Sequence, residues 1–107
     1  MYKIVTALLL FASIQAYGAQ TLSAPFEKGN AQTGKQLYEK NNCNRCHIAM
    51  MGGDGSAIFT RIDRRVRNPQ QLLVQLGICG ANAGVTLSDQ DKQDIAAYLN
   101  MNYYKFK

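Results

Sequence analysis

The sequence predicts an all-α domain, and three helix-start signals carry that prediction. Asn30 precedes a segment with apolar residues at helical spacing, and Asn68 is a cap residue followed by Pro69 at the first helical position. Ser88 stands three positions before Asp91, as in a capping box. Since a chain of 107 residues suits one domain, we expect three to four helices packed in a single unit.

The first helix is expected over residues 31–40. Gly34 and Tyr38 lie four positions apart and therefore share one face of that helix. A glycine inside a helix costs about 1 kcal/mol relative to alanine, so it usually marks a close approach of another helix. The sequence thus predicts a helix crossing at Gly34.

The middle of the chain predicts less regular structure. Residues 56–66 have apolar positions three or four apart among several arginines, which indicates a short helix or an irregular turn. The helix that starts at Pro69 is expected to end at Gly77, because glycine commonly follows a helix C-terminus. Residues 78–87 would then form a loop of small residues.

The last helix is expected to bury a stripe that includes Ile95 and Leu99 and extends to Met101. The tail 103–107 is aromatic and basic. We expect it to fold back on the helices, and contact with a partner or with lipid headgroups is the alternative.

The stretch Cys43-Asn44-Arg45-Cys46-His47 is a C-x-x-C-H motif. Two thiols at this spacing can add to the two vinyl groups of one haem, and the histidine beside them is then held under the iron. The motif therefore predicts one covalent haem c, with Cys43 and Cys46 as thioether residues and His47 as the proximal axial iron ligand.

Other chemistries share part of this pattern. A thioredoxin-like redox pair would need a surrounding βαβ pattern, which this sequence lacks. A zinc site could use Cys79 and His47 with the pair, but zinc sites usually have two spaced pairs. A disulfide between Cys43 and Cys46 would close a tight and strained ring.

The glycine-rich residues 52–55 follow the motif and indicate a loop, because glycine permits the positive φ angles of tight turns. We expect a backbone carbonyl of this loop to accept the Nδ1 proton of His47 and fix its tautomer. Among Arg61, Arg64, Arg65 and Arg67, at least one is expected to contact a haem propionate, since guanidinium matches carboxylate geometry. A solvated face and a patch for docking a partner are the alternatives.

Residues 1–19 have the layout of a secretory signal, with one lysine, an apolar run and small residues near its end. We expect cleavage of this signal, an uncleaved anchor being the alternative, and a periplasmic or exported domain over residues 20–107. Two of the three cysteines belong to the motif, which leaves Cys79 as an odd thiol in an oxidising compartment.

The formal net charge of +5 favours redox partners with acidic docking surfaces, ordinary solubility charge being the alternative. Peripheral contact with anionic lipid is compatible with the same charge. Nucleic acid is not an expected partner of an exported protein.

The order of a helix with Gly34 and Tyr38, a C-x-x-C-H motif, a middle helix and a last helix with Tyr98 resembles class I cytochromes c across residues 30–101. The resemblance implies the cytochrome c fold, all-α around one haem, and one-electron transfer without substrate turnover. It also implies that the glycine and aromatic of the first helix meet Tyr98, and that Cys43, Cys46 and His47 hold the haem.

The sequence departs from that family at the sixth iron ligand. The family usually places a methionine in the loop before the last helix, and residues 77–88 contain none. Cys79 lies in this stretch and is the tentative distal ligand, because iron binds thiolate well. Packing as a small buried thiol and an intermolecular disulfide are its other roles. Met101 is a less favoured ligand, and Met50 and Met51 would have to round the haem edge.

The sequence thus predicts a periplasmic mono-haem c-type cytochrome that carries one electron and is not itself an enzyme. Two alternatives stay open. One is a ligand-binding or sensor haem protein with an open or displaceable sixth position. The other is a small haem subunit of an oxidoreductase complex.

Overall fold

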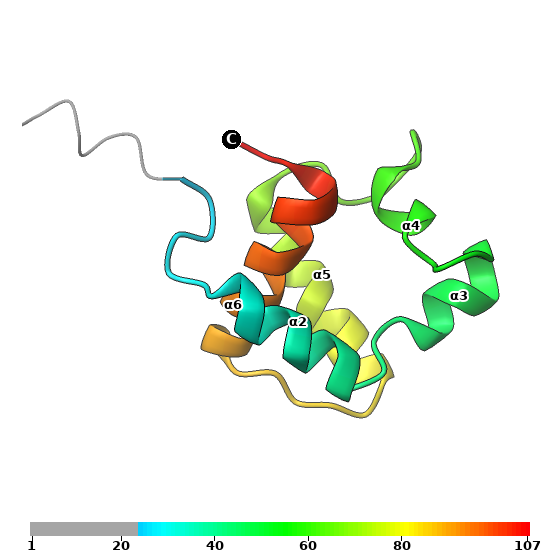
Figure 1. Ribbon diagram of the computed structural model, residues 1–107, viewed down its shortest axis with the longest axis horizontal. Helices are drawn as coiled ribbons and strands as arrows, with labels where there is room; N and C mark the ends of the chain where they lie inside the picture. Colours follow the sequence, from blue (N-terminus) through cyan, green and yellow to red (C-terminus); the bar gives the residue numbers. More distant parts are fainter. Residues whose placement is uncertain (1–23) are drawn as a thin grey trace, which may run out of the picture.

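A computed structural model describes residues 24–107, and within that range the fold is all-helical (Figure 1). The predicted signal, residues 1–19, lies outside the described residues. The elements in chain order are α2 (Ala31–Lys40), α3 (Arg45–Met51), α4 (Ala57–Thr60), α5 (Pro69–Asn82), α6 (Asp89–Leu99) and a π-helical turn η2 (Asn100–Tyr104). The all-α prediction is confirmed.

The helix starts lie where their cap residues predict. The side chain of Asn30 accepts from the Thr33 N–H, and that of Asn68 accepts from the Gln71 N–H. Ser88 forms the predicted capping box with Asp91 at the start of α6. Each cap satisfies N–H groups that the first turn of a helix leaves without partners.

The predicted crossing at Gly34 joins α2 to α6. A Cβ on Gly34 would overlap the backbone carbonyl of Asp94 and would come within 2.9 Å of the Ile95 Cα. The rings of Tyr38 and Tyr98 pack across the same crossing with centroids 5.8 Å apart. Glycine is therefore required here for the approach of the two backbones, and the expected helix crossing and its Tyr38–Tyr98 contact are confirmed.

A buried carboxylate also joins these two helices. Asp94 is only 6% exposed, and its Oδ1 accepts from the Asn30 backbone N–H and from Gln90 Nε2, each at 2.8 Å. These bonds offset the cost of burying the carboxylate and satisfy a further N–H at the start of α2. The sequence pattern did not single out Asp94, because its partner Asn30 is remote in sequence.

The prediction that α5 ends at Gly77 is wrong, since the helix continues to Asn82. The terminating glycine is Gly84, with φ +76°. The Val85 N–H bonds to the Gly80 carbonyl at 2.8 Å and the Gly84 N–H to the Ala81 carbonyl at 3.0 Å, which is a Schellman motif. The expected loop therefore shrinks to the residues between Asn82 and the α6 cap.

The short helix expected within residues 56–66 is α4, and Ile62, which follows it, is 88% exposed. The expectation that Met101 extends the buried stripe of α6 is wrong. Met101 is 63% exposed, because α6 passes into the π-helical turn and the buried stripe ends at Leu99. A helical period extrapolated across that turn places Met101 on the wrong side.

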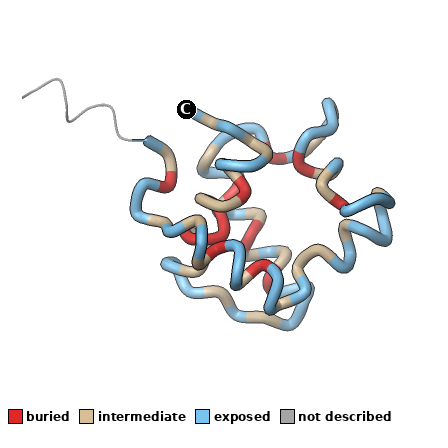
Figure 2. The backbone as a smooth tube through the Cα atoms, in the orientation of Figure 1, coloured by how far each residue is buried: buried red, intermediate tan, exposed pale blue. Residues whose placement is uncertain are grey.

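The core lies where α6 meets α2 and α5, and Figure 2 shows the buried residues gathered there. Its most buried large side chains are Leu72, Ile95 and Leu99. The tail folds back as predicted: the Tyr103 ring stacks on Phe59 at 5.0 Å and Phe106 stacks on Tyr104 at 5.2 Å. Over residues 24–107 we find no helix with the length and apolar character to cross a membrane.

Candidate haem-binding site

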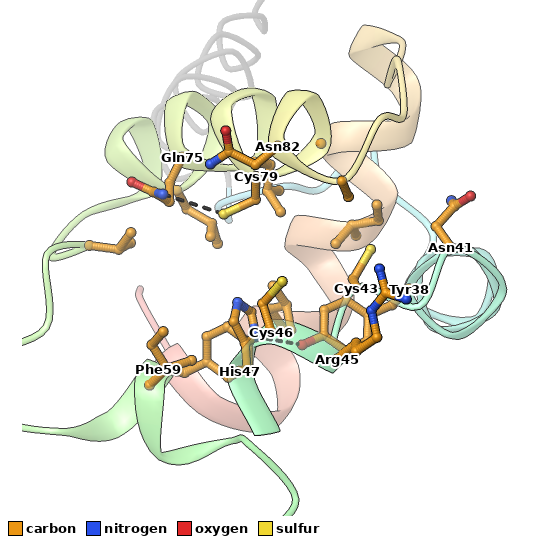
Figure 3. Close-up of a pocket in the computed structure, with 18 of the residues that line it drawn as sticks. Tyr38, Asn41, Cys43, Arg45, Cys46, His47, Phe59, Gln75, Cys79 and Asn82 are labelled. Carbon is orange, nitrogen blue, oxygen red and sulfur yellow. Dashed lines mark hydrogen bonds between the residues drawn. The ribbon is translucent and has the colours of Figure 1, made fainter. Parts of the chain in front are cut away.

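A cavity of about 750 Å³ lies between α5 and the segment that carries α3 and α4 (Figure 3). Its size falls within the range of roughly 300–1,000 Å³ that small-molecule and cofactor sites occupy. Cys43, Cys46 and His47 all line it, and core side chains such as Leu72 and Leu76 form its apolar inner surface. The structure therefore brings the three residues of the C-x-x-C-H motif to one cavity.

The wall that carries these three residues is called the motif wall below and consists of α3 and α4 with the turn before α3. Asn42 has a left-handed φ of +53°, which asparagine tolerates, and the Cys43 N–H returns to the Tyr38 carbonyl at 3.1 Å. This turn leads directly from α2 into the motif. Cys43 is partly buried, whereas Cys46 is exposed.

The imidazole of His47 is held by contacts on two sides. The edge of the ring meets Phe59 of α4 in a T-shaped arrangement, with centroids 5.3 Å apart and an interplanar angle of 87°. Nδ1 lies 3.1 Å from the Tyr38 hydroxyl oxygen. Burial lowers the pKa of His47, which favours the neutral imidazole that can ligate a metal.

The expectation that a carbonyl of the 52–55 loop accepts from His47 is wrong. The partner of Nδ1 is the Tyr38 hydroxyl, while the Asp54 carbonyl accepts from the side-chain amide of Asn44. Asn44 is the N-cap residue of α3 but makes no capping bond, and its Oδ1 instead accepts from the Tyr38 hydroxyl at 2.8 Å. The loop thus supports the motif through Asn44.

The loop also packs tightly against the motif at Gly55. Its φ is +83°, and a Cβ there would lie 2.9 Å from the Ile48 backbone nitrogen and 3.0 Å from the His47 Cβ. Both the backbone conformation and the space therefore require glycine. Gly55 and Phe59 are parts of the site that the sequence reasoning missed.

The opposite wall, called the α5 wall below, presents polar side chains to the cavity. Figure 3 shows Gln75, Cys79 and Asn82 on one face of α5, across from His47 and Cys46. Gln75 Nε2 donates to the Cys79 Sγ at 3.3 Å. Cys79 was expected in a loop and lies instead within α5, one turn beyond Gln75. Burial, and secondarily the nearby Cys79, raises the pKa of Cys43.

The methionines occupy different places. Met50 and Met51 line the cavity from α3, the helix that carries His47, and the Met51 Sδ accepts from Arg61 Nη1 at 3.5 Å. Met101 is exposed on η2 and is not among the described residues that line the cavity.

Arginines surround the cavity on the motif side. Arg45, Arg61 and Arg65 contribute to its lining. Arg64 Nε is buried and has no hydrogen-bond partner within residues 24–107. Arg64 also lies near Tyr104, a residue that lines the cavity: burial raises the pKa of Tyr104, and the charge of Arg64 partly opposes that rise. A guanidinium N–H without a partner suits a carboxylate such as a haem propionate.

The alternatives to haem find little geometric support. All three cysteines are free thiols. The described part of the chain contains no group of three or more His, Cys, Asp or Glu side chains that could hold a metal ion, as a zinc site would need. By contrast, one neutral imidazole, two neighbouring thiols and a large apolar cavity fit a haem.

An all-helical domain with a C-x-x-C-H motif beside such a cavity has the features of a c-type cytochrome. The family model for cytochrome C oxidase, cbb3-type, subunit III matches residues 29–99, which is more than half of the chain. The chain belongs to this family, and its domain is a haem c domain for electron transfer. No curated protein and no solved structure matches it.

Proposed function

We propose that this chain is an exported mono-haem cytochrome that carries one electron at a time. Cys43 and Cys46 form the thioether bonds and His47 supplies the proximal axial nitrogen. The observation that carries the proposal is the meeting of these three side chains at one cavity with an apolar inner surface. The haem, when bound, supplies an iron that changes its charge by one electron.

The residues of the chain have distinct tasks in this proposal. Phe59 holds the plane of the His47 ring, and the core residues exclude water from the inner side of the cavity. Cys46 is exposed, so the attachment face lies at the surface where a partner can approach. The net charge of +5 and the arginines at the cavity favour an acidic docking surface on that partner.

The test is expression in a host that matures c-type cytochromes and export of the product. We expect one haem per chain that survives denaturing electrophoresis. Changing either Cys43 or Cys46 to serine should remove one thioether bond and alter the pyridine haemochrome spectrum, whereas Cys79→Ser should leave both bonds intact. A purified product without covalent haem contradicts the proposal.

We further propose Cys79 as the distal ligand. Its support is its position on the α5 wall across the cavity from His47, and the absence of methionine from residues 77–88. Thiolate ligation would favour ferric iron and lower the reduction potential. Loss of the low-spin ferric spectrum in Cys79→Ala supports it, whereas an unchanged spectrum or a methionine–iron charge-transfer band contradicts it.

Two other functions have specific support. The family is named for an oxidase subunit, which favours a small haem subunit of a larger complex. Stable co-purification with other redox subunits would distinguish this from a free carrier. The polar side chains of Gln75 and Asn82 on the α5 wall favour a sensor with a displaceable sixth ligand, and rapid binding of carbon monoxide by the reduced protein would identify that function.

A further inference from the structure

The hydrogen bonds around His47 determine which atoms carry protons. The Asp54 carbonyl can only accept, so the Asn44 atom facing it is the amide nitrogen. The Asn44 oxygen therefore faces Tyr38, and because an amide oxygen can only accept, the Tyr38 hydroxyl donates its single proton to it. The Asp54 carbonyl thus fixes the orientation of the Asn44 amide.

The contact between Tyr38 and His47 then has one direction. The Tyr38 proton is already committed to Asn44, so its oxygen presents a lone pair to the His47 ring at 3.1 Å. Nδ1 must carry the proton that fills this contact. The neutral imidazole consequently has an unprotonated Nε2, which is the state required of a histidine that binds a metal through that atom.

We propose that Tyr38 is the positioning residue of His47: its oxygen accepts the Nδ1 proton, and Asn44 orients the hydroxyl so that it cannot donate to His47 instead. The proposal rests on the proposed function of His47 and goes further, because it assigns to a side chain the task that a backbone carbonyl was expected to perform. An acceptor on Nδ1 makes the imidazole a more basic ligand and favours oxidised iron.

The surroundings keep Tyr38 in this role. Its side chain is 7% exposed and packs between the rings of Tyr98 and Phe59, with centroids at 5.8 and 6.4 Å. Gly55, which abuts both His47 and Asn44, sets the distance between the loop and the motif.

The first measurement uses the protein with its natural sequence, without any substitution. The sequence has one histidine, so nitrogen-15 labelling of histidine gives a spectrum of His47 alone. We expect a protonated Nδ1 whose proton exchanges slowly with water. An unprotonated Nδ1, or one that exchanges as fast as an exposed imidazole, overturns the proposal.

The second measurement compares Tyr38→Phe with Tyr98→Phe in the haem-loaded protein. Both remove one hydroxyl from the same aromatic contact, but only Tyr38 touches His47. Tyr38→Phe should raise the reduction potential, weaken the iron–histidine stretch and speed Nδ1–H exchange roughly five- to tenfold, as loss of an ordinary hydrogen bond implies. Tyr98→Phe should change none of these, and equal changes in both variants overturn the proposal.

The two proposals can fail separately. An unmodified protein that carries no haem contradicts the proposed function. The tautomer of His47 can then still be measured in the haem-free protein, because the hydrogen bonds join groups of the chain alone. If Tyr38→Phe does not accumulate, the spectrum of the unmodified protein decides the proposal by itself.

Discussion

The motif wall and the α5 wall face the same cavity but differ in how firmly they hold their side chains. His47 is fixed by the Tyr38 hydroxyl, the Phe59 ring and the close approach of Gly55. Cys79 has a single hydrogen bond, from an amide on its own helix. The difference teaches that the position of His47 is built by several elements, while the position of Cys79 depends on one helix.

Loss of the Phe59 ring should have the largest effect. Phe59→Ala removes a side chain that is 6% exposed and contacts four rings, so it should lower the free energy of unfolding by roughly 3–5 kcal/mol, measured by urea denaturation. Val74→Ala on the exposed face of α5 is the control, since Val74 is 65% exposed. A cost equal to that of the control would mean that the four ring contacts of Phe59 do not stabilise the motif wall.

Gly55→Ala should come next. The φ of +83° is strained for alanine, and its Cβ would lie against Ile48 and His47. Together these effects should lower the stability by roughly 1–3 kcal/mol and shift the haem absorption spectrum. The matched control is Gly53→Ala, where φ is +56° but no atom lies near the added Cβ.

Gly53→Ala should therefore show backbone strain alone, about 1 kcal/mol, without the spectral shift. Equal stability losses and unchanged spectra in both variants would show that Gly55 matters only for its backbone conformation.

Cys79→Ala should have a smaller effect on stability, within about 1 kcal/mol, because the thiol is only partly buried. Its effect on the spin state of the iron should nevertheless be large if the thiolate is a ligand, and optical spectroscopy of ferric protein measures it. Met101→Leu is the control, since Met101 is exposed and lies away from the cavity lining. A spectral change in the control alone would transfer the role to Met101.

Gln75→Ala should have the smallest effect. It removes the one hydrogen bond to the Cys79 sulfur and should change stability by no more than about 0.5 kcal/mol. If Cys79 is the distal ligand, carbon monoxide should bind the reduced variant faster than the protein of natural sequence, because the Cys79 sulfur has lost its hydrogen bond. Identical binding rates, measured by stopped-flow mixing, would show that the α5 wall does not depend on Gln75.

The sequence was most informative where the signal is local. Cap residues gave the starts of α2, α5 and α6, and Gly34 marked the helix crossing, because each depends on the residue's own backbone or on its absent Cβ. The three residues of the motif line one cavity, and this too is a local relation, because they lie within five consecutive positions of the chain.

The rest depended on contacts between segments far apart in sequence. Gly77 looked like a helix end, but α5 continues past it to Asn82, and Gly80 leaves room for Val85 and Leu87 of the returning chain. Tyr38 was recognised as a packing residue, while its hydroxyl bond to His47 depends on where the turn after α2 directs the motif. No local pattern encodes such a relation.

The stacking of Tyr103 on Phe59 has a consequence for the timing of folding. Phe59 supports His47, and Tyr103 and Tyr104 support Phe59 from the last described turn of the chain. During vectorial synthesis or translocation the motif therefore emerges well before Tyr103 and Tyr104, the residues that support Phe59. The histidine is fully held only after the C-terminal aromatic residues have arrived, so stalled or truncated chains should present the two thiols of the motif beside an imidazole that lacks the support of a fixed Phe59 ring.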